Sequence, residues 1–347
     1  MIFEKALSAT KAFDVIGFGE VMLRLSSPNK ERISLSETFE KKAGGSELNV
    51  VSGISLLGLR TGIVTKLPGN EIGKFVKHKI RFCNVSDDFL VYDSSAHKKL
   101  GIYYYESGAY PRKPTVVYDR YQSSLSSIRL DEIDVSVFSN TKVFHVSGTS
   151  LALSENVREV AIEMIKRFKE QGVLISFDVN YRASLWDEET ARETILSVLP
   201  YIDILFVSEE TSRRMLRQEG TLEEIMRNYT KTYGVKVVAA TMRKVMSPTR
   251  HTWSSKIYSA AEDRFYTEEP YEEIEVVDRI GSGDAYLAGT LFGLIKYNCL
   301  QKALEFGNAM AAIKNTVPGD MPACDYEEIV KVIKSHKKEG IESEMNR

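Results

Sequence analysis

The stretch Asp278-Arg279-Ile280-Gly281-Ser282-Gly283-Asp284-Ala285-Tyr286 places an acid beside two glycines where an apolar helix is predicted to begin. Gly281 and Gly283 let the backbone approach a ligand closely, and the free N–H groups and dipole of the first helical turn attract an anion. A phosphate repels a carboxylate, so Asp284 is suited to accept a proton from an attacking hydroxyl. Taken alone, these residues fit an N-cap Asp after turn glycines equally well.

Three familiar phosphate-handling signatures are absent from the sequence. A dinucleotide fingerprint requires a third glycine where Tyr286 stands, and a Walker loop requires a Gly-Lys-Ser or Gly-Lys-Thr ending that the chain lacks. The His-Arg-Asp and Asp-Phe-Gly triplets of protein kinases are also missing.

Composition bounds the class of protein. The chain has 347 residues, 43% of them hydrophobic, which is enough for one large α/β domain or for a domain with an appendage. Its net charge is −2, with acids and bases interspersed, which argues against nucleic acid and favours a small-molecule ligand. The three cysteines form no CxxC pair, which favours a reducing compartment over a disulfide scaffold or a zinc site.

The first residues do not resemble a targeting segment. Met1 to Phe13 contains Glu4, Lys5 and Lys11 and no sustained apolar run, which argues against a signal peptide. No apolar stretch approaches the roughly 20 residues needed to span a bilayer. We therefore expect a cytoplasmic protein with no membrane partner.

Short apolar segments rich in β-branched residues alternate with longer amphipathic segments along most of the chain. This is the pattern of a largely parallel sheet covered by helices. We expect strands at 15–18, 62–65, 143–146, 173–177, 204–207 and 235–239, and helices at 47–57, 71–82, 155–169, 188–199, 285–296, 302–316 and 325–335. The charged tail at 336–347 is expected to fray.

Two helix-poor segments, at about 23–42 and 96–120, break the alternation. In the second, the extended runs Gly101 to Glu106 and Thr115 to Arg120 flank a loop with one glycine and two prolines, which predicts a hairpin. The two segments together predict a small β appendage over one end of the sheet. It is either a lid or an ordinary edge hairpin.

A second glycine site, Ala43-Gly44-Gly45-Ser46-Glu47-Leu48-Asn49, also stands just before an apolar helix. Adjacent glycines permit close ligand approach or a hinge motion, and Asn49, about one turn into the helix, has the amide to bond a hydroxyl. A flexible turn with an exposed Asn is the alternative.

These runs, together with Gly69-Asn70-Glu71-Ile72-Gly73, resemble in order and spacing the signatures of the ribokinase-like, or PfkB, sugar kinases. The resemblance covers nearly the whole chain and implies a kinase domain at 12–335. It implies a doubly wound αβα sandwich with a mostly parallel central sheet and a small β lid. It also implies transfer of the γ-phosphoryl of ATP, with Mg²⁺, to an alcohol. By the same resemblance, the role of base falls to Asp284 and that of anion hole to the backbone of Gly281, Ser282 and Gly283.

Within the family, Phe177-Asp178-Val179-Asn180-Tyr181-Arg182-Ala183-Ser184-Leu185-Trp186 resembles the sugar-acid branch of 2-keto-3-deoxygluconate kinases. By that resemblance Arg182 binds the substrate carboxylate, which suits a planar guanidinium. The hairpin resembles the lid strands of that branch, which makes Tyr103 and Arg120 substrate contacts alongside Gly44, Gly45 and Asn49. Tyr105 shares the face of Tyr103, whereas Tyr104 points away.

The nucleotide side departs from the family pattern. Where many members have Asn-x-x-Glu, this chain has Ser208-Glu209-Glu210-Thr211, so the metal ligands cannot be assigned from the sequence, although Glu210 fits with a shift of one residue. We expect Ser208 on this side, Thr241 and Arg243 as phosphate neighbours, and Asn308 near the adenine.

The sequence leaves three functions open: a sugar-acid kinase, another PfkB kinase such as a fructokinase or ribokinase, and a non-catalytic sugar-acid sensor. Arg182 and Arg120 favour an acidic substrate, and the retained Asp284 favours catalysis. We also expect a homodimer formed through the lid.

Overall fold

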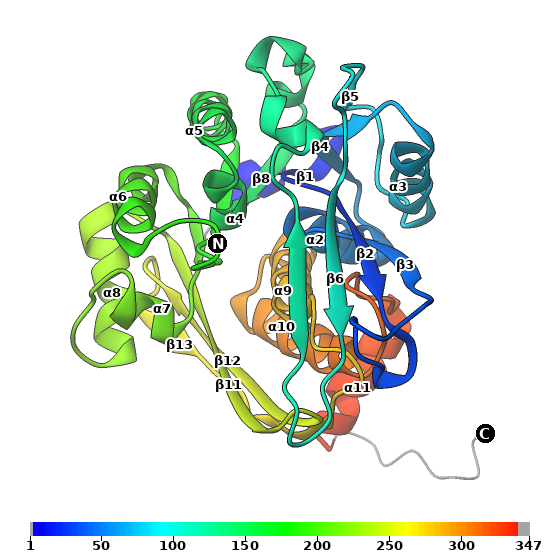
Figure 1. Ribbon diagram of the computed structural model, residues 1–347. Coiled ribbons are helices and arrows are strands. Elements are labelled where there is room, and N and C mark those ends of the chain that lie inside the picture. The colour runs from blue at the N-terminus through cyan, green and yellow to red at the C-terminus, as the bar shows by residue number, and fades with distance from the viewer. Residues whose placement is uncertain (1–2, 339–347) are drawn as a thin grey trace.

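The computed structural model describes residues 3–338 and is built on a ten-stranded sheet (Figure 1). The strands run in the order β13-β12-β11-β10-β9-β8-β1-β4-β5, with β14 pairing with β12. All neighbours from β11 to β5 are parallel, whereas β12 is antiparallel to its three partners. The strands are β1 (Phe13–Phe18), β4 (Thr61–Pro68), β5 (Leu90–Asp93), β8 (Thr141–Ser147), β9 (Leu174–Asp178), β10 (Ile204–Phe206), β11 (Val237–Ser247), β12 (Arg250–Ser259), β13 (Arg264–Tyr266) and β14 (Tyr271–Glu275).

Helices cover both faces of this sheet because its strands are apolar on both sides. In β1, Val15 belongs to one hydrophobic cluster and Ile16 and Phe18 to the other. The first cluster packs under α2 (Ser46–Leu56), α3 (Glu71–Phe82), α9 (Ser282–Tyr297), α10 (Leu300–Asn315) and α11 (Tyr326–His336). The second packs under α4 (Gly148–Ala152), α5 (Glu155–Glu170), α6 (Glu188–Val198) and α8 (Leu222–Tyr233), whereas α7 (Glu209–Arg214) adds no apolar side chain to it. The two groups of helices stand apart in Figure 1, and α1 (Glu4–Leu7) precedes β1.

Local signals fix the helix ends. The Asn70 side chain accepts hydrogen bonds from the N–H groups of Ile72 and Gly73 and so starts α3, as Ser154 and Asp187 do for α5 and α6. Gly234 ends α8 in the left-handed conformation, at φ 76°.

A second, four-stranded sheet has the order β3-β2-β6-β7. It contains β2 (Met22–Ser26), β3 (Glu40–Gly44), β6 (Gly101–Glu106) and β7 (Thr115–Asp119). The expected hairpin is present as the antiparallel pair β6–β7, while β2 and β6 are parallel. Figure 1 shows β6 and β7 crossing in front of the layer formed by α9 and α10. The predicted α/β sandwich with a mostly parallel sheet and a small β-sheet is therefore confirmed.

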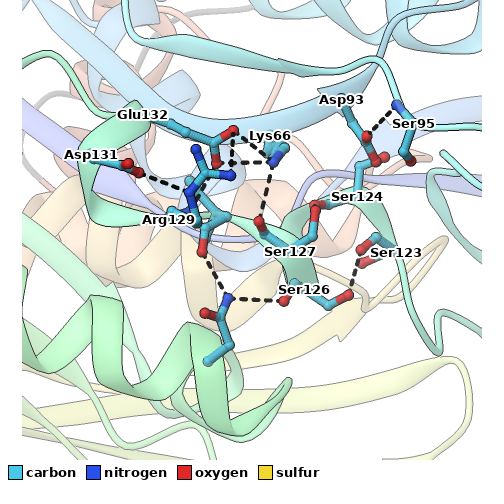
Figure 2. Close-up of polar contacts among 12 residues, drawn as sticks. Lys66, Asp93, Ser95, Ser123, Ser124, Ser126, Ser127, Arg129, Asp131 and Glu132 are labelled. Carbon is cyan, nitrogen blue, oxygen red and sulfur yellow. Dashed lines mark hydrogen bonds and ion pairs between the residues drawn. The ribbon is translucent and has the colours of Figure 1, made fainter.

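The segment that follows β7 is anchored to the main sheet (Figure 2). Lys66, on β4, donates to the Ser127 carbonyl at 3.1 Å and pairs with Glu132 at 2.9 Å. Asn156, on α5, donates to the carbonyls of Ser126 and Ile128. These bonds fix the 3-10 turns Ser124–Ser127 and Leu130–Glu132, and with them the end of the small sheet.

Within residues 3–338, no helix combines the length and the apolar character needed to cross a membrane. The last nine residues of the predicted charged tail, 339–347, lie outside the described residues.

Candidate active site

A cavity of ≈ 1020 Å³ opens at the carboxyl ends of β9 and β10, between the small sheet and the first turns of α2 and α9. Open α/β sheets bind ligands at this edge. Residues distant in sequence meet there, and its walls include Glu20, Gly45, Ser46, Glu47, Asn49, Tyr103, Tyr118, Arg120, Asp178, Asn180, Arg182, Ser208, Glu210, Thr241, Arg243, Arg279, Gly281, Ser282, Gly283, Asp284 and Asp320.

The start of α9 forms one wall of this cavity. Gly281 is its N-cap at φ 83°, and no side chain in the described part of the chain caps the helix. A Cβ added to Gly281 would lie 2.0 Å from the Asp320 carbonyl oxygen, whereas one added to Gly283 would meet nothing within 4 Å. Among the described residues, none accepts a hydrogen bond from the backbone N–H of Gly283 or Asp284. The turn is thus shaped by packing at Gly281 and presents unbonded donors at Gly283, which fits an anion.

Two donors from the start of α2 hold the Asp284 carboxylate. Asn49 Nδ2 donates to its Oδ2 at 2.6 Å, and Ser46 Oγ donates to its Oδ1 at 3.1 Å. Burial in the cavity wall raises the pKa of Asp284, while the bonds from Asn49 and Ser46 and the charge of Arg182 oppose the rise. The carboxylate is therefore a stronger base than an exposed aspartate, and it is fixed in orientation.

A second carboxyl group lies close to the first. Asn180, at φ 36°, donates from its side chain to Ser46 Oγ at 3.0 Å and from its backbone N–H to Asp178 Oδ1 at 3.2 Å. Burial, followed by the charge of Asp284, raises the pKa of Asp178 to about 7. The end of β9 is thus joined through Ser46 to the starts of both α2 and α9.

Glu47 lines the cavity and is almost wholly buried. Its Oε1 accepts bonds from the Ser147 N–H at 2.9 Å and from the hydroxyls of Ser147 and Ser150, each at 2.7 Å. Burial raises the pKa of Glu47 to about 7, although these bonds oppose the rise. No cation pairs with Glu47 among the described residues, so the carboxyl depends on hydrogen bonds alone.

The two glycines before α2 have different surroundings. Gly45 lies on the cavity wall at φ 150°, and a Cβ there would come 2.3 Å from the Glu20 carbonyl oxygen. Gly44 is not on the wall, and a Cβ there would come 2.1 Å from Asp320 Oδ2. The expected ligand contact of Gly44 is therefore not supported, because the missing side chain makes room for a carboxylate of the protein.

A buried network joins the small sheet to the start of α9. Arg24, on β2, pairs with Asp278 at 2.5 Å and with Asp320 at 2.6 Å, and its guanidinium lies 4.2 Å from the ring centre of Tyr105. The Tyr103 hydroxyl donates to Asp320. Tyr103 and Tyr105 are both buried, as their expected shared face requires, and Tyr103 reaches the cavity wall.

Arg120 also reaches the wall, where it forms an ion pair with Glu20 at 2.5 Å. Ser123 donates to the same carboxyl group. Tyr118, which the sequence did not single out, lies beside Tyr103 with ring centres 5.8 Å apart and also lines the cavity.

Three arginines that have no ion-pair partner among the described residues bring positive charge to the cavity. Within residues 3–338, no carboxylate forms an ion pair with Arg182, Arg243 or Arg279. Arg182 donates to the Tyr181 carbonyl, and Arg279 Nε is buried without a partner among the described residues. Burial, then the charges of Arg279 and Arg182, lowers the pKa of Arg243. Three guanidinium groups close enough to affect one another, with no acid paired to them, form a site for a polyanion.

Of the residues expected on the nucleotide side, three line the cavity and one does not. Ser208 caps α7 by accepting from the Thr211 N–H at 3.1 Å, and Ser208, Thr241 and Arg243 all line the cavity. Asn308 does not. It is fully buried on α10, where its amide donates to Glu268 at 2.6 Å and accepts from Ser255 at 2.7 Å. The expected adenine contact of Asn308 is therefore not supported, because both ends of the amide are used by the protein.

Several wall residues were missed from the sequence, above all Asp320, Glu20 and Arg279. Asp320 and Glu20 carry no local signal, because their partners Arg24, Tyr103 and Arg120 lie far away in the chain. Arg279 stood inside the quoted motif and could have been found from its place beside the anion hole. Among the described residues, no group of three or more His, Cys, Asp or Glu side chains could hold a metal ion by itself.

The comparisons with known proteins agree with this geometry. Residues 12–325 match the model of the pfkB family carbohydrate kinases. The chain belongs to this family. It is accordingly a sugar kinase, and thus a phosphotransferase, which confirms the resemblance found in the sequence.

Relatives in the family include kinases named for sugar acids. The 2-dehydro-3-deoxygalactonokinase of Haloferax volcanii is 32% identical over 92% of this chain and 96% of its own. The 5-dehydro-2-deoxygluconokinase of Clostridium beijerinckii is 28% identical over 97% of this chain and 96% of its own. The structure of the 2-dehydro-3-deoxygluconokinase of Thermotoga maritima is 32% identical, with a TM-score of 0.88, over 93% of this chain and 98% of its own.

Proposed function

We propose that this PfkB kinase phosphorylates a sugar acid, 2-keto-3-deoxygluconate, with ATP to give 2-keto-3-deoxy-6-phosphogluconate and ADP. The observation that carries the proposal is a set of three arginines on one cavity, Arg182, Arg243 and Arg279, none of which forms an ion pair with a described residue. ATP and a sugar acid together bring both phosphates and a carboxylate to these arginines, whereas ATP and a neutral sugar bring the phosphates alone. The names of the Haloferax and Thermotoga relatives, which differ in the epimer, support a 2-keto-3-deoxy sugar acid.

In this proposal Asp284 is the general base. A substrate hydroxyl that approaches Asp284 gives up its proton as the oxygen attacks the γ-phosphorus in line. Asn49 and Ser46 orient the carboxylate, and the Asn49 Oδ1 atom, buried without a partner among the described residues, accepts from a second hydroxyl. The N–H donors of Gly281 and Gly283 are assigned to the charge that develops on the transferred phosphoryl group, whereas the Ser282 N–H already donates to the Arg279 carbonyl at 3.3 Å.

The substrate carboxylate is assigned to Arg182, a cavity-wall residue whose charge already acts on Asp178 and Asp284. Tyr103 and Gly45 shape the pocket for the sugar acid. Arg120 contributes as a donor only if the substrate competes with its ion pair to Glu20 at 2.5 Å.

ATP is assigned to the other end of the cavity, along Ser208, Thr241 and Arg243. When bound, Mg²⁺ neutralises phosphate charge and orients the γ-phosphoryl. Glu210, an exposed carboxylate on the cavity wall, is the residue that would hold it. Asn308 has no part in this assignment because its amide is already bonded.

The kinase domain is proposed to span 12–335, with the small sheet as a lid that closes over the sugar acid and excludes water. We also propose a cytoplasmic homodimer formed through this lid, since the edge strand β7 exposes Val117 by 49%. Light scattering on the wild type and on Val117→Lys tests the dimer, which the substitution should dissociate.

Coupled ADP release tests the substrate class directly. The panel consists of 2-keto-3-deoxygluconate, its galacto epimer, fructose and ribose, each with ATP. We expect kcat/KM to be highest for a 2-keto-3-deoxy acid, and Arg182→Gln to raise the KM for the acid by about 10-fold to 100-fold while leaving the KM for ATP nearly unchanged. A preference for fructose or ribose would identify another activity of the family, and binding of the acid without ADP release would indicate a sensor.

A further inference from the structure

Lys314, on α10, has no solvent exposure. Lysines are almost never fully buried without a partner, because the ammonium group loses its hydration. This one lies behind the start of α9 rather than on the cavity wall, and none of the roles assigned above uses it.

The ammonium group of Lys314 bonds to backbone rather than to a carboxylate. Its Nζ donates to the Asp278 carbonyl at 3.0 Å and to the Val317 carbonyl at 3.2 Å. Asp278 begins the turn that leads through Gly281 into α9, and Val317 begins the turn that leads to Asp320. Because a Cβ on Gly281 would lie 2.0 Å from the Asp320 carbonyl oxygen, the two turns are packed directly on each other.

The surrounding charges keep the ammonium in place. Asp278 and Asp320 both pair with Arg24, at 2.5 and 2.6 Å, but its single positive charge balances only one of them, and together with Asp284 they attract Lys314 electrostatically. Burial lowers the pKa of Lys314 to about 8, and the carboxylates oppose the fall, so the group is mainly protonated at neutral pH. A cation between backbone carbonyl oxygens is also how proteins hold alkali-metal and ammonium ions.

We propose that Lys314 is an internal monovalent cation that positions the anion hole, holding turns 278–281 and 316–320 together by their carbonyl oxygens. Lys314 touches neither substrate and acts through the backbone of Gly281 to Gly283. The catalytic part of this inference rests on the function proposed above for Asp284 and its anion hole. Two consequences follow. The wild type needs no added monovalent cation, and removal of the side chain leaves a site that a small cation can refill.

The first test measures melting temperature and does not depend on knowing the substrate. Lys314→Ala is melted in K⁺, NH₄⁺, methylammonium and tetramethylammonium chloride at equal ionic strength. We expect its melting temperature to rise by several degrees in a small cation relative to tetramethylammonium, because a ligand of the native state stabilises it by mass action. The wild type and the exposed control Lys296→Ala should show no such difference. Equal melting of Lys314→Ala in all four salts would overturn the proposal.

The second test measures turnover. We expect wild-type kcat to be the same within about twofold in all four salts, and kcat of Lys314→Ala to fall at least about tenfold in tetramethylammonium and to recover in NH₄⁺ or methylammonium. Wild-type dependence on K⁺ or NH₄⁺, or a loss that no cation rescues, would overturn the proposal. If Lys314→Ala does not fold, the wild-type arm decides. If the wild type shows no kinase activity, the proposed function fails, while the melting test still decides whether Lys314 acts as a cation.

Discussion

Replacing Glu47 with Gln should make the protein more stable at neutral pH and leave its stability nearly unchanged in mild acid. Glu47 is 1% exposed and relies on bonds from Ser147 and Ser150, and no cation within residues 3–338 pairs with it. A glutamine side chain at this position would keep an acceptor oxygen for these donors but would never carry the charge. The substitution therefore isolates the cost of a buried carboxylate.

The magnitude follows from the pKa. The pKa of Glu47 rises from 4.5 to about 7 in the native protein. The native carboxyl therefore holds its proton more tightly than the unfolded one, so its contribution is full below pH 4.5 and is lost as pH rises through 7. The shift corresponds to about 3 kcal/mol in total, of which about 2.5 kcal/mol is lost between about pH 5 and pH 8.

Urea unfolding of the ligand-free protein at about pH 5 and pH 8 measures this difference, with coincident fluorescence and circular dichroism transitions as the check on two-state behaviour. The free energy of unfolding of Glu47→Gln, relative to that of the wild type, should be about 2.5 kcal/mol larger at pH 8 than at pH 5. For the exposed control Glu159→Gln, the difference in unfolding free energy from the wild type should be the same at both pH values. Parallel pH curves for Glu47→Gln and the wild type would refute the reasoning, because Glu47 would then have an ordinary pKa.

Two further predictions concern the network around Asp284. Asn49→Ala removes a bond that lowers the pKa of Asp284, so the acidic limb of the pH profile of kcat/KM should move to higher pH. An acidic limb at an unchanged pH would show that it does not report the titration of Asp284. Arg24→Met leaves the buried carboxylates of Asp278 and Asp320 without their cation and should cost about 3–5 kcal/mol in urea unfolding. The exposed Arg129→Met is its control, and a cost below about 1 kcal/mol would show that the pairs contribute little.

The alternation of apolar segments predicted the parallel core because each segment carries its own signal. α3 begins and ends where its cap and periodicity place it, at Glu71–Phe82. The long antiparallel pair β11–β12 was missed beyond Ala239, because the outer half of β11 leaves the core and carries Arg243 and Lys244 in place of apolar alternation. Its extended conformation depends on pairing with β12.

The residues of the candidate site also divide into those with a local sequence signal and those that depend on contacts distant in the sequence. Motifs within a few residues, such as Gly281 to Asp284 and Gly45 to Asn49, could be recognised from local chemistry. The network that links Arg24, Tyr103 and Asp320 could not, because its members lie far apart in the chain. For Gly44 the sequence predicted a ligand where the structure places Asp320, since a missing side chain looks the same in sequence whatever fills the space.

The most direct test of the account is the turnover of Asp284→Asn. The amide keeps the size of the side chain and can still bond to Asn49 and Ser46, but it cannot take a proton. We expect kcat for the sugar acid to fall by about 10²–10⁴, with the affinity for ATP, measured by calorimetry, nearly unchanged. A kcat near that of the wild type would contradict the assignment of Asp284 as the base and, with it, the central claim.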